Sequence, residues 1–294
     1  MWGGFLYYIQ ESDKPSWLNK TFNIVKLENN KIILQIETES IKNIESITNK
    51  KARKLAQKTK KLLDKTNSKK IIISKNIKKI TSYINYLHSY NYEIVDSKWL
   101  FEVLSSKALD FIVEKKNMKK EEIKVGILVN DLTENTLENI RNIVKQYKSV
   151  NIVTNHLEKF KKIEEQILQE DGIIMTVTNN KKKSLSKTDL ILNIDFPSEL
   201  INKYNINEYA IIINIKGNVK INKKRFKGVN INDYEIEFEK NNKDFESVDF
   251  SKYKLTEMYE AKLYKKIPYK NIVEILKKDK VKISMLQGSN SKIF

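Results

Sequence analysis

Histidine and cysteine, which often serve in catalysis and metal binding, are scarce in this sequence. It has two histidines, His88 and His156, and no cysteine, which excludes a disulfide framework, a thiolate metal site and a thiol nucleophile. Two histidines among scattered carboxylates form no recognisable set of metal ligands. The glycines do not have the spacing of a phosphate-binding loop or of a hydrolase nucleophile elbow. We therefore predict no catalytic residue and no metal ligand.

Polar side chains directly follow three apolar runs, at residues 124–129, 151–154 and 189–194. If these runs are parallel strands of one open sheet, their carboxyl ends meet at the edge where such sheets bind ligands. The predicted ligand edge consists of Asn130, Asp131, Asn155, His156 and Asp195. The plainer alternative is that polar residues simply populate the loops of an asparagine-rich protein.

A run of three lysines, Lys181, Lys182 and Lys183, follows a further expected strand. It would supply positive charge for a small-molecule or anionic ligand at the same edge of the sheet. His156 has a second interpretation, because a lone loop histidine is more often a solvated surface group than a general base. His88 lies in a polar and aromatic segment, and we interpret it as structural.

The formal net charge of +18 raises the question of a nucleic-acid partner. Arginine occurs only three times, while lysine, isoleucine and asparagine are abundant, as is typical of an AT-rich bacterial genome. Because arginine is the residue that reads guanine edges and grips phosphate in two places, we expect no sequence-specific recognition of nucleic acid. Non-specific attraction of a polyanion stays open.

The most basic element is a helix expected over residues 49–65, with an apolar stripe on one side and lysines on the others. One interpretation is a contact with a polyanion or a membrane surface. The simpler interpretation is a solvent face coated with lysine. The sequence contains no run approaching the roughly 20 apolar residues that a membrane span requires.

The elements that would hold the ligand edge alternate along residues 123–215 between apolar runs and amphipathic segments. The entry from Asp131 to Glu134 has the spacing of a capping box, and a helix over 157–170 would turn Leu168 inward. This order is typical of a parallel, Rossmann-like sheet. Strands are expected at 124–129, 151–154, 173–177, 189–194 and 210–215.

Two of these segments resemble a known group of proteins. Residues 152–159 read Ile-Val-Thr-Asn-His-Leu-Glu-Lys and resemble the I-V-N-R-T-x-E-K run of the shikimate dehydrogenase and glutamyl-tRNA reductase group. Residues 188–197 are similar to that group's A-D-L-V-I-N-A-T-P strand. The resemblance covers about a third of the chain. It implies an NAD(P)-binding domain of the Rossmann type, whose first strand runs into a glycine-rich turn that holds the cofactor's pyrophosphate.

The sequence departs from that pattern at the turn itself. Residues 130–135 contain no glycine, and Asp131 and Glu134 stand where phosphate would sit. His156 replaces the arginine that, in the group, helps to hold the adenosine phosphate. We therefore expect no cofactor, with NAD(P) binding in an altered manner as the alternative.

The predicted fold class is α/β, with a Rossmann-like parallel sheet preceded by a smaller β-rich and βαβα region and followed by helices. The β-rich region includes a hairpin of residues 22–27 and 31–36, and helices are expected at 77–90 and 98–116. Residues 219–228 would end the Rossmann-like sheet, and 230–245 would cover it. The expected domains are 1–48, a β-rich region; 49–120, a small α/β unit with the basic helix; 121–228, the Rossmann-like domain; and 229–294, the covering segment and helices.

Three functional hypotheses follow. The first is a non-catalytic Rossmann-like protein with a sensor, scaffold or regulatory role and a degenerate dinucleotide site. The second is an NAD(P)-dependent oxidoreductase with an atypical cofactor turn. The third is a non-specific binder of nucleic acid or another polyanion that uses the helix at 49–65 and the lysines at 181–183. A cytoplasmic location is the default expectation in each case.

Overall fold

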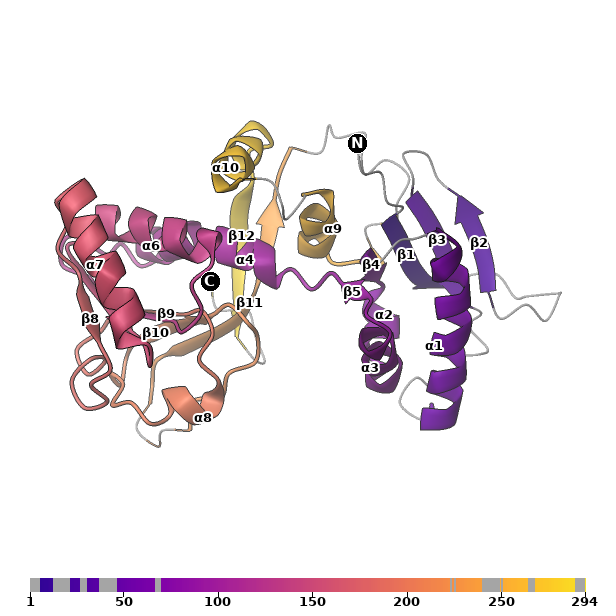
Figure 1. The fold of residues 1–294 in the computed structure, drawn as a ribbon, viewed down its shortest axis with the longest axis horizontal. Helices are drawn as coiled ribbons and strands as arrows, with labels where there is room; N and C mark the ends of the chain where they lie inside the picture. The colour runs from indigo at the N-terminus through magenta and orange to yellow at the C-terminus, as the bar shows by residue number, and fades with distance from the viewer. Residues whose placement is uncertain are drawn as a thin grey trace. The chain divides into compact units, whose positions relative to one another are not determined.

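The computed structural model divides the chain into two compact units (Figure 1). Unit 1 consists of Met1–Ser97 and Lys240–Lys266, and unit 2 of Lys98–Glu239 and Ile267–Phe294. Both units are therefore assembled from segments that are distant in sequence. The structure describes residues 6–12, 22–26, 31–36, 47–66, 70–222, 224, 226–239, 249, 251–263, 268–288 and 294.

In the described part of unit 1, five strands form one sheet in the order β2-β3-β1-β4-β5. The pairs β1·β3, β1·β4 and β4·β5 are parallel, whereas β2 and β3 form the predicted antiparallel hairpin. The turn predicted between these two strands lies outside the described residues. The strands are β1 (Leu6–Glu11), β2 (Phe22–Lys26), β3 (Lys31–Ile36), β4 (Lys70–Ile73) and β5 (Glu93–Ile94).

Helices cover one face of this sheet because their apolar stripes share a core with it. The stripe of α1 (Asn49–Leu63) packs with α2 (Lys75–Lys78) and α3 (Thr81–Ser89) against Ile71 and Ile73 of β4. On the other face, the Tyr8 ring meets the Tyr253 ring edge-on, just before α9 (Leu255–Lys262).

The single helix expected over residues 77–90 is wrong, because the chain leaves helical geometry at Ile80 (φ −83°, ψ 75°). The hydroxyl of Ser74 accepts a hydrogen bond from the Ile77 amide and starts α2 early. The break between α2 and α3 allows both Ile77 and Ile80 to enter the core.

In the described part of unit 2, seven strands form one sheet in the order β12-β11-β10-β9-β6-β7-β8. Numbered from β6, its six parallel strands follow the order 3-2-1-4-5-6 of the Rossmann fold, and β12 joins the edge antiparallel. The prediction of a Rossmann-like α/β fold is therefore confirmed. The strands are β6 (Lys124–Leu128), β7 (Ser149–Val153), β8 (Thr176–Thr178), β9 (Leu190–Asn193), β10 (Ile211–Asn214), β11 (Val229–Glu237) and β12 (Lys282–Gly288).

The Rossmann-type sheet extends further than the sequence predicts. β11 pairs parallel with β10, so the expectation that the sheet ends at residues 219–228 is wrong. Ile231, Tyr234 and Ile236 are buried, while acidic residues between them remain accessible. This alternation of acidic and apolar residues belongs to a sheet strand and does not indicate an irregular cover.

Helices in the described part of unit 2 cover the sheet and include two that were expected in another domain. The segment 98–116 forms two helices that hydrogen-bond to α6: Glu102 accepts from Thr136, and Ser106 accepts from Gln146. The compact units therefore divide the chain between Ser97 and Lys98, ahead of the boundary expected at 117–122. The helices are α4 (Lys98–Val103), α5 (Ser105–Lys115), α6 (Glu134–Gln146), α7 (Leu157–Asp171), α8 (Ser198–Ile201) and α10 (Tyr269–Lys278).

Three local predictions in unit 2 are wrong. Thr133, and not Asp131, caps α6, since its hydroxyl accepts from the Thr136 amide at 3.1 Å. Leu168 is 49% exposed because the inward stripe of α7 passes through Phe160 and Ile167. Gly172 ends α7 at φ 67°, and an extended link with Ile174 79% exposed delays β8 to residue 176.

Within the part of the chain that the structure describes, no helix is both long enough and apolar enough to span a bilayer.

Candidate functional site

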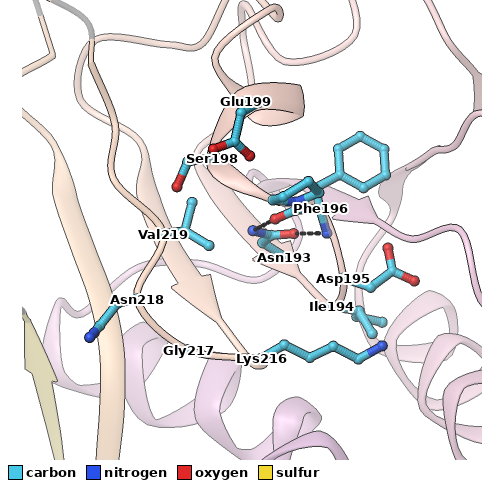
Figure 2. Close-up of a pocket in the computed structure, with 11 residues that line it drawn as sticks. Asn193, Ile194, Asp195, Phe196, Ser198, Glu199, Lys216, Gly217, Asn218 and Val219 are labelled. Carbon is cyan, nitrogen blue, oxygen red and sulfur yellow. Dashed lines mark hydrogen bonds between the residues drawn. The ribbon is translucent and has the colours of Figure 1, made fainter. Parts of the chain in front are cut away.

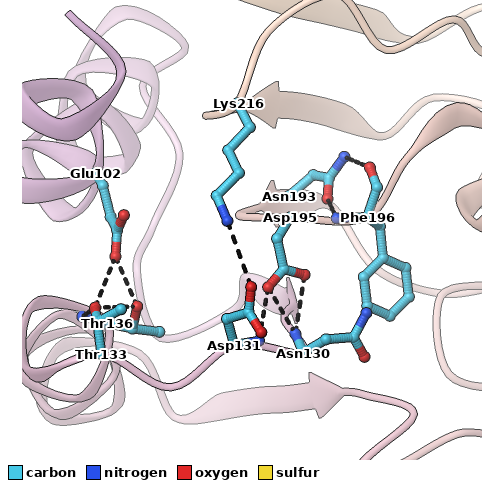
Figure 3. A network of polar contacts seen from close by, with 9 residues as sticks. All are labelled: Glu102, Asn130, Asp131, Thr133, Thr136, Asn193, Asp195, Phe196 and Lys216. Carbon is cyan, nitrogen blue, oxygen red and sulfur yellow. Dashed lines mark hydrogen bonds and ion pairs between the residues drawn. The ribbon is translucent and has the colours of Figure 1, made fainter. Parts of the chain in front are cut away.

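The carboxyl ends of β6, β7 and β9 bring together the polar residues that follow them. Figure 3 shows those that follow β6 and β9. The Asp195 carboxylate, beyond β9, accepts hydrogen bonds from the Asn130 amide at 2.9 Å to each oxygen. It also accepts one from the Asp131 amide at 2.7 Å. The carboxylate therefore occupies the first two backbone donors of the turn that joins β6 to α6.

The side chain of Asn130 extends this cluster to the next strand. Its Oδ1 atom accepts a hydrogen bond at 2.9 Å from the amide of Asn155, which follows β7. Four of the five residues of the predicted ligand edge are thus joined by hydrogen bonds. The fifth, His156, is exposed at the start of α7, where its backbone amide donates to the Thr154 hydroxyl at 3.0 Å.

The three lysines at 181–183 are exposed and belong to a turn after β8. Asn180 Oδ1 accepts hydrogen bonds from the amides of Lys182 and Lys183 at 3.0 and 3.1 Å. The Lys181 carbonyl accepts one from the Asn205 amide at 2.7 Å. The backbone hydrogen bonds of this run are therefore with Asn180, Asn205 and the Ser186 hydroxyl, and not with the cluster around Asp195.

Negative charge surrounds the start of α6. Besides Asp195, it includes the exposed Asp131 and Glu134, and Glu102, whose Oε1 accepts from the Thr136 hydroxyl at 2.6 Å. Lys216 places its Nζ 3.8 Å from Asp131 Oδ2 (Figure 3). Because the positive end of the helix dipole is already matched by these carboxylates, a phosphate placed here would meet like charges.

A pocket of about 300 Å³ opens between the carboxyl ends of β9 and β10 (Figure 2). Its charged groups are Asp195, Glu199 and Lys216, and its size lies at the lower end of small-molecule sites. The lining residues are Asn193, Ile194, Asp195, Phe196, Pro197, Ser198, Glu199, Lys216, Gly217, Asn218 and Val219.

A chain of three asparagine amides, two of them buried, holds the walls of this pocket. Asn193 Nδ2 donates to Asn214 Oδ1 at 2.9 Å, and Asn214 Nδ2 donates to Asn230 Oδ1 at 2.8 Å. Asn230 Nδ2 then donates to the Val219 carbonyl at 2.7 Å. The amide chain therefore links the ends of β9 and β10 with the start of β11, and ties them to the loop that follows β10.

Sequence reasoning missed this amide chain, although a signal was present. An Asn-Ile pair recurs at the ends of β9 and β10 and at the start of β11, at 193–194, 214–215 and 230–231. In β9 and β10 the asparagine ends an otherwise apolar run, and burial leaves Asn193 only 1% and Asn214 0% exposed. A buried asparagine needs partners for its amide, so the repeat indicates cross-strand hydrogen bonds.

Comparisons with known proteins find remote similarity only. No family model matches the chain, and no curated protein matches its sequence. Among solved structures, L-tryptophan dehydrogenase from Nostoc punctiforme has 11% identity and a TM-score of 0.33, over 76% of this chain and 66% of that one. A shikimate dehydrogenase in complex with NADP+ has 10% identity and a TM-score of 0.32, over 78% and 84%. Ornithine carbamoyltransferase from Pyrococcus furiosus has 16% identity and a TM-score of 0.24, over 65% and 59%.

The fold assignment comes from the sheet order and not from these similarities. Unit 2 is a Rossmann-type domain. The matched regions span 66% of the tryptophan dehydrogenase chain and 59% of the ornithine carbamoyltransferase chain. The enzymes differ in reaction, and their activities do not transfer to this chain on a likeness of this kind.

Proposed function

We propose that this protein is a non-catalytic Rossmann-type protein with a sensor, scaffold or regulatory role, and that it binds no dinucleotide at the turn after β6. The observation that supports the proposal is the Asp195 carboxylate on the amides of Asn130 and Asp131. In dinucleotide-binding domains, the corresponding turn donates its amides to the pyrophosphate of the cofactor.

Competition favours the carboxylate over an incoming phosphate. Asp195 is tethered to the sheet, so its effective concentration at the turn is on the order of millimolar or above. A dinucleotide would have to displace it and then bind beside Asp131 and Glu134. The absence of glycine from residues 130–135 adds side chains where the backbone would need to approach the cofactor.

The pocket between β9 and β10 is the place where a sensor function would take its ligand. Its mixture of carboxylate, amine and amide groups suits a small polar molecule better than an apolar one. The proposal also includes a cytoplasmic location, which cell fractionation would test.

A thermal-shift titration tests the proposal. We expect neither NADH nor NADPH to raise the melting temperature of the full chain at moderate salt. A ligand present at a hundred times its dissociation constant would stabilise the native state by about 2.7 kcal/mol, so binding would be visible. A clear rise with NADPH would contradict the proposal and favour an oxidoreductase with an altered cofactor turn.

A variant tests the reason given for the absence of binding. Asp195→Ala frees the amides of Asn130 and Asp131, and we expect it to acquire a melting-temperature response to inorganic pyrophosphate. Glu199→Ala is the matched control, because Glu199 lines the same pocket and is exposed. If Asp195→Ala is too unstable to assay, Asp195→Asn removes the charge but keeps one oxygen acceptor, so a smaller response to pyrophosphate is expected. Equal responses of the Asp195 variant and the control would contradict the role given to Asp195.

A further inference from the structure

Positive charge is concentrated in one segment of the chain. Residues 47–92 contain 13 lysines and arginines and a single acid, Asp64, whereas the other 248 residues contain 42 and 36. This segment therefore holds 12 of the 18 net positive charges. A lysine-rich composition alone explains abundant lysine throughout the chain, but it does not explain why acidic residues are missing from one segment.

The structure places most of this charge on the outer face of α1. Ala52, Leu55, Ala56, Thr59 and Leu63 of this helix are buried, and its cations lie on the remaining surface. The single acid is engaged already, since Asp64 pairs with Lys60 and accepts from the Tyr92 hydroxyl at 2.7 Å. The exposed cations are Lys50, Lys51, Arg53, Lys54, Lys58 and Lys61.

The neighbouring helix leaves the positive face uninterrupted. α3 packs beside α1 in the same core and contains no acidic residue. Its exposed side chains include Asn85, His88 and Ser89, which are hydrogen-bonding groups without negative charge. By contrast, both lysines of α2 have partners within unit 1: Lys75 donates to the Ser251 carbonyl, and Lys78 pairs with Glu257.

The arrangement along α1 is linear. Lys50, Lys54 and Lys61 lie at positions i, i+4 and i+11, which fall on one side of a helix. With a rise of about 1.5 Å per residue, this row spans about 16 Å. One strand of duplex DNA presents a phosphate every 3.4 Å or so along the axis, so the row faces several phosphates at once.

We propose that the exposed face of α1 binds the phosphodiester backbone of nucleic acid without reading its sequence. An anionic bilayer fits less well, because an interfacial helix inserts its apolar face into lipid and the apolar stripe of α1 is buried in the unit 1 core. Lysine suits a sequence-independent contact, since its ammonium group meets phosphate as a point charge.

The test measures binding of the full chain to a labelled DNA duplex of about 20 base pairs between 50 and 200 mM salt. We expect binding in the micromolar range that weakens steeply as salt rises. The triple variant Lys50→Gln, Lys54→Gln, Lys61→Gln should reduce the slope of log affinity against log salt by about 2 to 3. Its affinity at low salt should fall at least about tenfold.

The matched control removes three charges elsewhere. Lys181→Gln, Lys182→Gln, Lys183→Gln changes the net charge equally at an exposed run of unit 2, and it should keep the wild-type slope. Glutamine preserves helix propensity, and a thermal melt checks folding; the double variant at Lys50 and Lys54 replaces the triple if the triple does not fold. Absence of duplex binding by the wild-type chain, or equal losses in the two triple variants, would overturn the proposal. Binding to phosphatidylserine vesicles without binding to DNA would also overturn it, in favour of a lipid surface.

Discussion

Asp195 can hold the turn after β6 because its own loop is fixed. The Asn193 side chain clips residues 193–196 together, accepting from the Phe196 amide and donating to the Phe196 carbonyl, each at 2.9 Å. This short, closed loop directs the carboxylate toward the Asn130 amide (Figure 3). The same two strand ends that would form a cofactor site in an open Rossmann domain are therefore joined by the protein's own side chain.

A second carboxylate, Glu257 in unit 1, is in a less favourable position. It is 4% exposed, Lys78 contacts its Oε1 atom, and its Oε2 atom has no hydrogen-bond partner among the described residues. Loss of hydration raises the pKa of Glu257 above its usual value of 4.5, and the nearby Lys78 offsets this only in part. The folded state therefore holds the Glu257 proton more tightly than the unfolded state does.

This difference predicts a dependence of stability on pH. Protonated Glu257 is tolerated by the fold, so its stabilising contribution is present at low pH and is lost as pH rises from about 4.5 through the raised pKa. Glu257→Gln cannot ionise and should lose less stability over this range. In urea titrations, the unfolding free energy of the variant minus that of the wild type should increase between pH 5 and pH 8.

The control for this prediction is Glu121→Gln, at an exposed position of unit 2. Its unfolding free energy should track that of the wild type at every pH. A Glu257→Gln difference that stays constant or shrinks with rising pH would show that the ion pair with Lys78 outweighs the loss of hydration.

At the scale of elements, the amide chain at the ends of β9 and β10 and the start of β11 supplies cross-strand hydrogen bonds between side chains, which apolar packing cannot supply. Asn214 stands at its centre, fully buried, and donates to Asn230 Oδ1, Asn232 Oδ1 and the Ile231 carbonyl at 2.8 to 3.1 Å. Removing it would take a donor from the buried Ile231 carbonyl and an acceptor from the buried Asn193 amide, which costs about 1 to 3 kcal/mol for each group that water cannot reach.

We therefore expect Asn214→Ala to lower the unfolding free energy by about 2 kcal/mol or more, measured by urea denaturation. Asn218→Ala is the control, because Asn218 lines the same pocket but is exposed, and it should change stability by less than about 0.5 kcal/mol. An Asn214→Ala variant as stable as this control would mean that water replaces the lost amide.

The sequence predicts these elements better than it predicts their contacts. The strands β6, β7, β9 and β10 follow from apolar runs such as Ile211–Asn214, which are typical of parallel strands buried on both faces. The bond between Asp195 and Asn130 joins residues 65 positions apart and depends on β9 lying beside β6. The missing glycine of the turn is the basis for predicting that phosphate does not bind there, but no local pattern indicates that Asp195 bonds to the turn.

Asparagine shows a second limit of sequence reasoning. In a chain where asparagine is abundant, Asn193 and Asn214 do not differ in type from the many asparagines in loops. Only their burial at strand ends distinguishes them, and that depends on how the sheet is covered. The basic helix is predicted correctly because its apolar stripe has a clear helical period, and it begins at the cap formed by Thr48.

At the scale of the whole molecule, charge is distributed unevenly between segments that fold together. Residues 47–92 supply three α-helices and one strand of unit 1 and carry 12 of the 18 net positive charges, so this unit folds against strong self-repulsion. The repelling cations lie at the protein surface, where salt screens their repulsion over a Debye length of about 8 to 10 Å.

This repulsion leads to a final prediction, which can be tested on the protein without any ligand. Raising sodium chloride from about 0.05 to 0.5 M should increase the melting temperature of the wild-type chain by a few degrees, because screening relieves repulsion among the cations of α1. The triple variant of Lys50, Lys54 and Lys61 should begin with a higher melting temperature at low salt and show a smaller increase. The triple variant of Lys181, Lys182 and Lys183 should respond as the wild type does, since its cations lie in the other unit. Equal salt responses in all three proteins would mean that the lysines of α1 are too well solvated to repel one another. The surface proposed to bind nucleic acid would then have a weaker electrostatic potential than its sequence indicates.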